Sequence, residues 1–170
     1  VEESRRLEAL VQDLLAYGRP RKPVFQSLDA AAFAATMQAH GGPLLHIDVP
    51  PLSITTDPQL LEQALLNLIR NAREAVDNRP HPQVRLTMAV IDGKAVRWTV
   101  ADNGPGFSPK AIEKLFVPFH TTKAFGTGLG LAITQKVIRT LGGSIEVVNQ
   151  GGGVVHVTLP LKPPQELNHG

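Results

Sequence analysis

The chain of 170 residues has the length of one domain, and its content of 42% hydrophobic and 19% charged residues is ordinary for a globular protein. The net charge of +2 is small and the basic residues are scattered, which disfavours a nucleic-acid-binding protein. The lack of cysteine excludes disulfides and thiolate metal sites, and no apolar run is long enough to span a membrane. Because Val1 begins no signal peptide and the chain starts without Met inside a helical pattern, we expect a fragment of a longer protein.

Residues 1–17 have the pattern of an amphipathic helix. Its apolar face is formed by Leu7, Leu10, Val11, Leu14 and Leu15. Gly18 and Pro20 end the helix and begin a connector. Two interpretations stay open at this point. The helix packs on its own domain, or it is one half of an intermolecular helical bundle.

Short elements fill the next part of the chain. We expect strands over residues 24–28, 44–49 and 52–55, and an alanine-rich helix that Asp29 caps and that continues to about Ala39. A Gly-Gly-Pro sequence ends this helix.

The helix that follows Asp57 has the clearest signals in the sequence. Asp57 is a candidate N-cap, and Pro58 occupies the first helical position, where its missing N–H does no harm. The wide apolar stripe of this helix consists of Leu61, Ala64, Leu65, Leu68, Ala72, Ala75 and Val76. Asn67 and Asn71 lie one turn apart at the margin of the stripe, with Glu74 beside them, although asparagine is a mediocre helix former. Their amide oxygens suit a hard cation such as Mg²⁺. Taken alone, however, the pair is better explained by amides that are solvated or bonded to the backbone.

A β-hairpin leads into a carboxylate that is followed by glycines. The sequence predicts strands over residues 83–91 and 94–100 around an Asp-Gly turn, which is a strong hairpin signal. Asp102 then precedes Gly104 and Gly106. Glycine tolerates positive φ and lets a ligand approach the backbone closely. An Asp-Asn-Gly sequence alone is also a common turn.

A second glycine-rich element, over residues 126–130, opens a helix expected over 127–141. Such a start presents free N–H groups and the positive helix end to an anion. The long loop over residues 116–125 contains Thr122 and Lys123 and is a candidate mobile lid. Together with the asparagine helix and Asp102, these elements predict a nucleotide pocket. The remaining expected elements are a short helix over 109–115 and a closing hairpin with strands over 144–149 and 154–161.

Four segments, in this order and at this spacing, resemble the N, G1, F and G2 boxes of the ATP-binding domain of sensor histidine kinases. They are NLIRNAREA (67–75), DNGPG (102–106), LFVPF (115–119) and GTGLG (126–130). The residues of these segments are most similar to those of kinases of the nitrogen-regulation type. The resemblance implies a two-layer α/β sandwich of the histidine kinase, gyrase and chaperone ATPase type, with a mixed, largely antiparallel sheet and helices on one face.

The same resemblance implies a division of the chain into three parts. Residues 1–19 are similar to the C-terminal end of the dimerisation-domain helix plus a linker, which favours the intermolecular interpretation of that helix. Residues 20–162 form the implied ATP-binding catalytic domain, and residues 163–170 are expected to be a flexible tail.

Residue roles follow from the resemblance by position. Asn71 matches the Mg²⁺ ligand, Asn67 the supporting asparagine, and Asp102 the carboxylate that accepts the adenine amino hydrogen. Backbone N–H groups of residues 126–130 would hold the phosphates, and Lys123 is a candidate phosphate contact. The implied ATP site consists of Asn67, Asn71, Glu74, Asp102, Gly104, Gly106, Phe119, Thr122, Lys123, Gly126, Thr127, Gly128, Leu129 and Gly130.

The resemblance implies a protein-histidine kinase with ATP and Mg²⁺ as cofactors. It would transfer the γ-phosphoryl group to a histidine on its dimerisation domain, for relay to the receiver domain of a response regulator. None of the histidines in the sequence stands in an acceptor context, so we assign no catalytic residue and expect the fragment alone to be inactive. The full-length protein is expected to be a homodimer that binds no nucleic acid. This domain is expected in the cytoplasm, with any membrane attachment made through upstream segments.

Two departures from the family pattern and several competing functions bear on this expectation. Glu74 stands where many members carry a basic residue, and Gly-Gly-Gly-Val-Val stands where relatives have Gly-Thr in the last hairpin. Hydrolases of the same fold and anti-sigma-factor serine kinases place a glutamate where this chain has Asn67, and an amide cannot act as a base. A nucleotide-sensing module without chemistry stays open. No Walker A sequence is present, and no strand runs directly into residues 126–130 as a Rossmann site requires.

Overall fold

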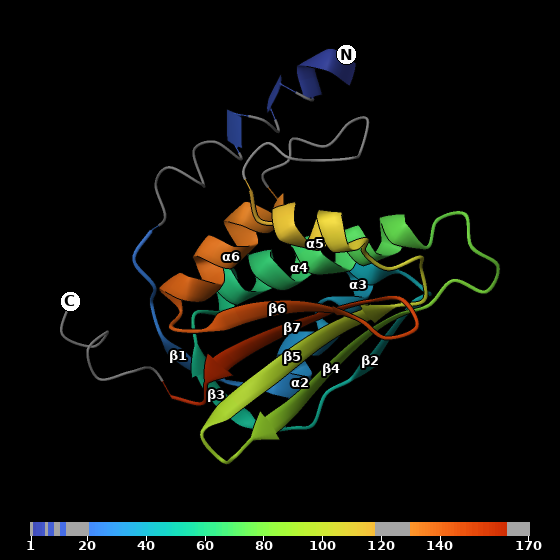
Figure 1. Ribbon diagram of the computed structural model, residues 1–170. Coiled ribbons are helices and arrows are strands. Elements are labelled where there is room, and N and C mark those ends of the chain that lie inside the picture. Colours follow the sequence, from blue (N-terminus) through green and yellow to red (C-terminus); the bar gives the residue numbers. More distant parts are fainter. Residues whose placement is uncertain (1, 6, 9–10, 13–20, 118–129, 163–170) are drawn as a thin grey trace.

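The computed structural model describes residues 2–5, 7–8, 11–12, 21–117 and 130–162 (Figure 1). Most of the expected lid and the whole of the expected tail therefore lie outside the described residues. No helix in the part of the chain that the structure describes is both long and apolar enough to cross a membrane.

The helix predicted at the N-terminus is observed at each of its described residues. Two side chains of its apolar face are largely exposed, with 62% of Leu7 and 46% of Val11 accessible. These two side chains are therefore not buried against the rest of the domain.

A mixed five-stranded sheet forms one layer of the domain. Its strands, in spatial order, are β2 (Leu45–Asp48), β4 (Val84–Ile91), β5 (Ala95–Asp102), β7 (Gly153–Pro160) and β6 (Ser144–Asn149). Strands β2 and β4 pair in parallel, and the other neighbours pair antiparallel. A second, two-stranded antiparallel sheet consists of β1 (Gln26–Asp29) and β3 (Ser53–Thr56). The predicted mixed, largely antiparallel sheet is confirmed.

The turn between β4 and β5 has the geometry that its sequence predicts. The N–H of Lys94 donates to the carbonyl of Ile91, and the two residues between them, Asp92 and Gly93, have φ angles of 53° and 68°. Positive φ at both central positions is the requirement of a type I′ turn, which matches the twist of the flanking strands. The hairpin places Asp102 at the end of β5, inside the strand rather than after it.

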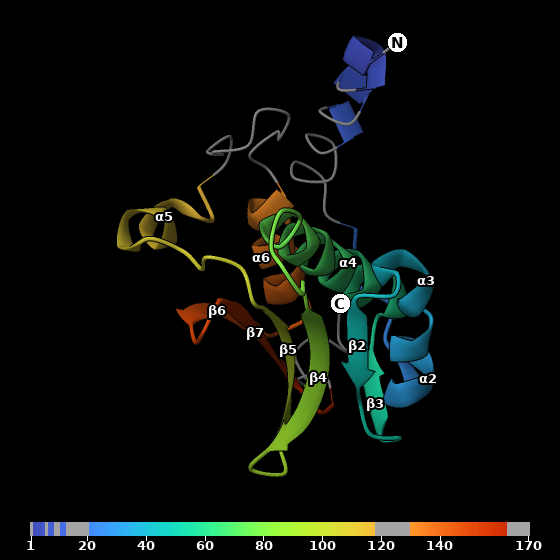
Figure 2. The same cartoon turned by 90° about the vertical axis from the view of Figure 1, so that its right-hand side faces the viewer.

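Helices form the second layer. They are α2 (Ala30–Ala35), α3 (Gln38–Gly41), α4 (Pro58–Ala75) and α6 (Gly130–Thr140). Helix α5 (Pro109–Lys114) stands apart from α4 and α6 and has no buried residue (Figure 2). Helices α4 and α6 lie side by side on one face of the sheet, as Figures 1 and 2 show. Strand β5 turns Val96, Trp98 and Val100 toward this layer, and all three are buried. Phe33 of α2 meets the Trp98 ring edge-to-face, with 5.8 Å between the centroids. The predicted packing of helices on one face is confirmed.

The expected helix from Asp29 to Ala39 is wrong in its length. Asp29 does cap α2, since its side chain accepts a hydrogen bond from the N–H of Ala32 at 2.8 Å. The helix ends at Ala35, where the N–H groups of Thr36 and Met37 donate to carbonyls three residues earlier, at 3.2 and 3.0 Å. The hydroxyl of Thr36 also donates to the carbonyl of Phe33, at 2.7 Å. Met37, which is fully buried, then leads into α3.

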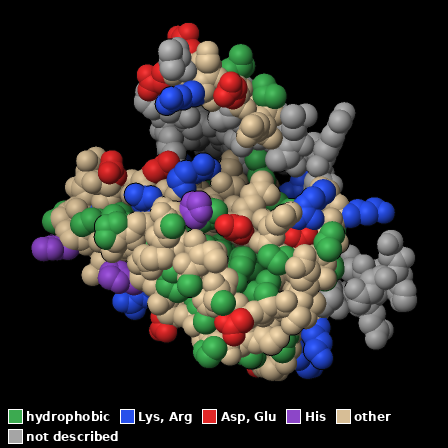
Figure 3. All heavy atoms as spheres, turned by 180° about the vertical axis from the view of Figure 1, so that it is seen from behind, with side chains coloured by type: hydrophobic (Ala, Val, Ile, Leu, Met, Phe, Trp, Pro, Cys, Tyr) green, Lys and Arg blue, Asp and Glu red, His purple; other side chains and the backbone are tan. Residues whose placement is uncertain are grey.

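The rear of the molecule is drawn with all heavy atoms in Figure 3. Acidic and basic side chains are interspersed there with hydrophobic ones, in keeping with the small net charge of +2. Long-range attraction to a polyanion needs charge of one sign gathered on one surface, and this face does not present it.

Candidate functional site

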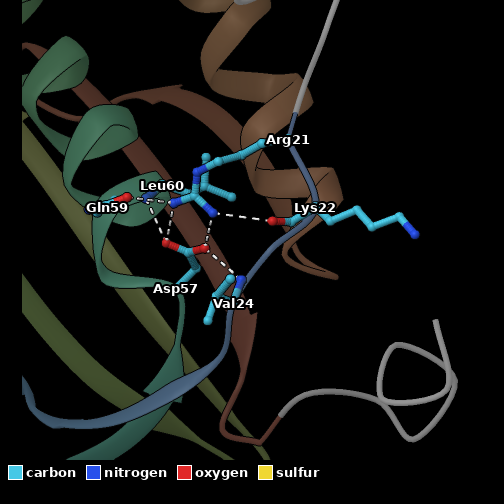
Figure 4. A network of polar contacts seen from close by, with 6 residues as sticks. All are labelled: Arg21, Lys22, Val24, Asp57, Gln59 and Leu60. Atoms are coloured by element: carbon cyan, nitrogen blue, oxygen red, sulfur yellow. Dashed lines mark hydrogen bonds and ion pairs between the residues drawn. The ribbon is translucent and has the colours of Figure 1, made fainter.

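Helix α4 is fixed at its N-terminus by Asp57. The Asp57 carboxylate accepts from the N–H of Leu60 at 3.1 Å, as an N-cap does. It also accepts from the N–H of Val24 at 2.7 Å and from both terminal nitrogens of Arg21, at 2.6 and 2.8 Å (Figure 4). Burial alone would raise the pKa of the Asp57 carboxyl, but the hydrogen bonds from Arg21, Val24 and Leu60 outweigh it and lower this pKa below its usual value. The segment before β1 is thereby tied to the start of α4.

One face of α4 carries Asn67, Asn71 and Ala75, which follow one another at intervals of four residues. The Asn67 amide is bonded at both ends. Its oxygen accepts from Arg70 at 2.9 Å, and its nitrogen lies 3.4 Å from the hydroxyl of Thr134 on α6. Asn67 therefore uses its side chain to join α4 to α6, which fits a supporting role better than metal ligation.

Asn71 lies one turn further along α4 and is half-buried, and Glu74 is exposed. Mg²⁺ commonly takes only one or two protein oxygens when phosphates supply others, so a single amide is a sufficient protein contribution. Among the described residues, no three His, Asp or Glu side chains are grouped so that they could hold a metal ion without such help.

Asp102 presents one fixed and one open carboxylate oxygen. Its Oδ1 accepts from the N–H of Gly104 at 2.8 Å and from the N–H of Gly153 at 3.2 Å. No hydrogen bond to Oδ2 is formed by the residues that the structure describes. A Cβ at Gly153 would lie 2.9 Å from Oδ2, so a side chain at this position would crowd the oxygen. The open oxygen is an acceptor of fixed direction, which suits the amino group of a base.

Gly104 links this carboxylate to the end of α4. A Cβ at Gly104 would lie 2.8 Å from the carbonyl oxygen of Ala75, so the loop and the helix are in direct contact there. Asn67 and Ala75 lie on one face of α4, and their positions are about 12 Å apart along the helix axis at a rise of about 1.5 Å per residue. The loop that follows Asp102, called the Asp102 loop, contacts this face at Ala75, and the first turns of α6 contact it at Asn67.

The start of α6 is described from Gly130 onward. Gly130 is half-buried, and a Cβ built there would meet no atom within 4 Å in the described structure. Its carbonyl accepts from the hydroxyl of Thr134, which is fully buried. The remaining predicted site residues lie outside the described residues and stay predictions. They are Phe119, Thr122, Lys123, Gly126, Thr127, Gly128 and Leu129.

Several residues at this site were missed by reasoning from the sequence. Thr134 ties α6 to Asn67, Gly153 donates to Asp102, and Asn103 and Asn149 bond to backbone groups around the glycine loop. Each acts on a partner far away in the sequence, for which the local pattern gives no signal. Gly153 could have been suspected from its place in a run of three glycines.

A protein-family model described as histidine kinase-, DNA gyrase B- and HSP90-like ATPase matches residues 56–163. The chain is 43% identical over 113 residues to the two-component sensor PprA of Pseudomonas aeruginosa, which covers 62% of this chain and 12% of PprA. It is 31% identical over 179 residues to the sensory histidine kinase/phosphatase NtrB of Vibrio alginolyticus, covering 96% of this chain and 50% of NtrB. The chain therefore spans half or less of the length of these two relatives.

Solved structures show the same similarity. Full-length ShkA in complex with AMPPNP superposes with a TM-score of 0.73 and 30% identity, over 92% of this chain and 36% of ShkA. Histidine kinase ThkA, in a complex with the response regulator protein TrrA, superposes with a TM-score of 0.68 and 27% identity. That alignment covers 93% of this chain and 48% of ThkA.

Proposed function

Because the chain belongs to the histidine kinase-, DNA gyrase B- and HSP90-like ATPase family, we propose that it is the ATP-binding catalytic domain of a sensor histidine kinase. The domain binds ATP and presents its γ-phosphoryl group to a histidine of a dimerisation domain, from which the group passes to a response regulator. The family predicted from the four sequence boxes is confirmed, and the similarity to NtrB supports the nitrogen-regulation type. A domain that uses ATP in this way works in the cytoplasm.

The Asp102 carboxylate is the observation that carries this proposal. Its Oδ1 is held by two backbone N–H groups, while Oδ2 stays open beside Gly153. An ionised carboxylate can only accept hydrogen bonds, so this oxygen selects a donor such as the adenine amino group. Because Gly104 and Gly153 have no Cβ, neither residue places a side chain of its own against the carboxylate.

The phosphate end of the nucleotide lies toward the start of α6 in this proposal. A nucleotide that enters base-first at Asp102 follows the face of α4 past Asn71 to the level of Asn67, which is tied to α6. Backbone N–H groups at a helix start stabilise phosphate oxygens. Mg²⁺, when bound, would neutralise phosphate charge, and Asn71 is the residue that would hold it.

The amide group of Asn67 favours transfer to a protein histidine over hydrolysis. A hydrolase needs a base that takes a proton from water. Asn67 has an amide at the position where hydrolases of this fold carry a glutamate, and that amide is engaged with Arg70 and Thr134. We assign residues 1–19 to the end of a dimerisation domain, and none of the histidines in this sequence stands in an acceptor context.

Two measurements test the proposed function. Titration calorimetry with ATP in the presence of Mg²⁺ is expected to give saturable binding, and the absence of heat at millimolar nucleotide would rule the proposal out. With γ-labelled ATP, the chain alone is expected to stay unlabelled and to release phosphate only at a background rate. A separate dimerisation domain added in trans should acquire an acid-labile, base-stable label. Binding without any transfer to such a domain would indicate a nucleotide sensor instead.

A further inference from the structure

The glycine loop that follows Asp102 is held at its start by an amide clamp. The side-chain oxygen of Asn103 accepts from the N–H of Gln83 at 2.8 Å, and its nitrogen donates to the carbonyl of His81 at 2.8 Å. The backbone N–H of Asn103 also donates to the carbonyl of Gln83. Asn103 is therefore fixed to the segment that leads into β4.

A second amide clamp holds the other end of the loop. The side-chain oxygen of Asn149 accepts from the N–H of Phe107 at 2.8 Å, and its nitrogen donates to the carbonyl of the same residue at 2.7 Å. Asn149 ends β6 and lies 42 positions after Phe107. Its planar amide pairs with one residue through a donor and an acceptor, much as a neighbouring strand would.

Between the two clamped residues lie Gly104, Pro105 and Gly106, which have little freedom left. Gly104 rests against the carbonyl of Ala75, and proline fixes its own φ. Gly106 has a φ of 77°, and a Cβ there would lie 2.7 Å from the side-chain oxygen of Asn149. The shape of the loop therefore depends on both asparagines.

The Asn149 clamp also reaches Asp102 through two contacts. Phe107, which it holds, places its ring against Gly153, where a Cβ would lie 2.9 Å from a ring carbon. Gly153 in turn donates its N–H to Oδ1 of Asp102 at 3.2 Å. Displacement of Phe107 would remove the ring that packs beside Gly153, whose N–H is one of the two donors that set the direction of the carboxylate.

We propose that Asn149, together with Asn103, is a positioning residue that holds the Asp102 loop in the shape that receives the adenine base, an inference that rests on the proposed function. Asn149 is exposed, so water can replace its bonds to Phe107 when the side chain is removed. Removal of the Asn149 side chain should therefore change the free energy of unfolding little, but the loop should lose its fixed conformation. The lost order must then be regained on binding, which weakens affinity.

The test compares Asn149→Ala with Gln150→Ala by titration calorimetry with Mg²⁺-ADP. Gln150 is the exposed neighbour, and its side chain makes no hydrogen bond to the described residues. Asn149→Ala is expected to raise the Kd for ADP about tenfold with an unchanged stoichiometry, as the loss of one or two hydrogen bonds predicts. Gln150→Ala should bind as the unmodified chain does. Amide exchange at residues 104–107 should become faster in Asn149→Ala while the core amides keep their protection.

The outcomes separate this inference from the proposed function. If the unmodified chain binds no ADP, the proposed function fails. If it binds and Asn149→Ala has the same Kd, the positioning role is wrong. A reduced stoichiometry at unchanged Kd would show that Asn149 only supports folding, and would also overturn the inference. Asn103→Ala, which removes the clamp from the opposite side, should raise the Kd in the same way and serves as the test if Asn149→Ala does not fold.

Discussion

Arg21 donates a hydrogen bond from each of its terminal nitrogens to the carboxylate of Asp57, which lies 36 positions later and caps helix α4. The same carboxylate binds the N–H of Val24, so one side chain holds both the segment before β1 and the helix that carries the asparagines. Asp57 is almost fully buried, whereas 41% of the Arg21 side chain is exposed. The pair is therefore half solvated, and its contribution to stability is intermediate between a surface and a buried ion pair.

Removal of the Arg21 side chain should destabilise the fold moderately. Arg21→Ala deletes two charge-assisted hydrogen bonds, but Asp57 keeps the N–H groups of Val24 and Leu60. We expect a loss of about 1 kcal/mol in the free energy of unfolding after allowance for solvent screening. Urea denaturation measures it, and Lys22→Ala, which removes an adjacent exposed cation, should leave the midpoint unchanged. Because the pKa of Asp57 is lowered in the folded state, its contribution is present above the unfolded pKa of about 4 and is lost as the pH falls below it.

His156 should make the stability of the fold depend on pH in a range above that of Asp57. Its Nδ1 lies 2.9 Å from the hydroxyl of Thr99, and burial, reinforced by Arg97 and opposed by Glu146, lowers the pKa of the imidazole. The unfolded chain therefore takes up this proton first as the pH falls, and stability decreases from about pH 6.5 downward through the folded pKa. With His156→Gln, the unfolding midpoint should change less between about pH 7 and pH 5. An equal slope in both proteins would assign the effect to other groups.

Asp102→Asn should change the base preference of the nucleotide site. The amide oxygen of asparagine can still accept from Gly104 and Gly153, so the loop keeps its anchor. The other atom becomes an N–H donor, which opposes the adenine amino group and suits the guanine oxygen. ADP affinity should fall by about 1.5–3 kcal/mol, and GDP affinity should change little or improve. Titrations with both nucleotides check this, and equal losses for the two bases would indicate general damage.

Two glycines of the site should respond in opposite ways to alanine. Gly104→Ala brings a Cβ within 2.8 Å of the Ala75 carbonyl, so the loop or the helix end must shift, and we expect about 1–3 kcal/mol of destabilisation. Gly130→Ala meets no atom within 4 Å and should leave the melting temperature unchanged or higher. If phosphates approach the backbone there, Gly130→Ala should nevertheless weaken ATP binding. Tight ATP binding by Gly130→Ala would remove this residue from the site.

Substitutions of the two asparagines of α4 should differ in their effect on the metal dependence of ATP binding. Asn71→Ala is expected to abolish the gain in ATP affinity that Mg²⁺ provides, because it removes the proposed ligand. Asn67→Ala should instead lower stability by about 1 kcal/mol, because it cuts the tie between α4 and α6. Titrations with Mg²⁺ and with EDTA, beside thermal melts, distinguish the two effects. Asn78→Ala, on an exposed turn, is the matched control.

Features that depend on neighbouring residues could be predicted from the sequence. Asp57 with Pro58 marks the start of α4, and an Asp-Gly pair between alternating strands marks the β4–β5 turn, because each signal acts within one turn of backbone. The order of the four boxes then identified the family. The end of α2 could not be predicted in this way, because the turn at Thr36 comes before the composition of the segment changes.

Contacts between distant parts of the chain could not be predicted in the same way. Asn149 stands before a glycine turn, where asparagine is expected for local reasons, and nothing nearby indicates that it binds Phe107. The bond of Asn67 to Thr134 likewise depends on how α4 and α6 pack. Such pairings are decided by the geometry of the sheet and of the helix layer, which hydrophobic patterning specifies only coarsely.

Trp98 gives the chain an intrinsic optical probe. It is the single tryptophan of the sequence, it is fully buried beneath Phe33, and its indole N–H makes no hydrogen bond to the described residues. An indole in so apolar a place fluoresces at short wavelength, because no mobile dipoles relax around its excited state, and exposure to water moves the emission to the red. Since Trp98 lies on the strand that ends at Asp102, one emission spectrum reports whether the sheet beneath the nucleotide loop is intact in each variant.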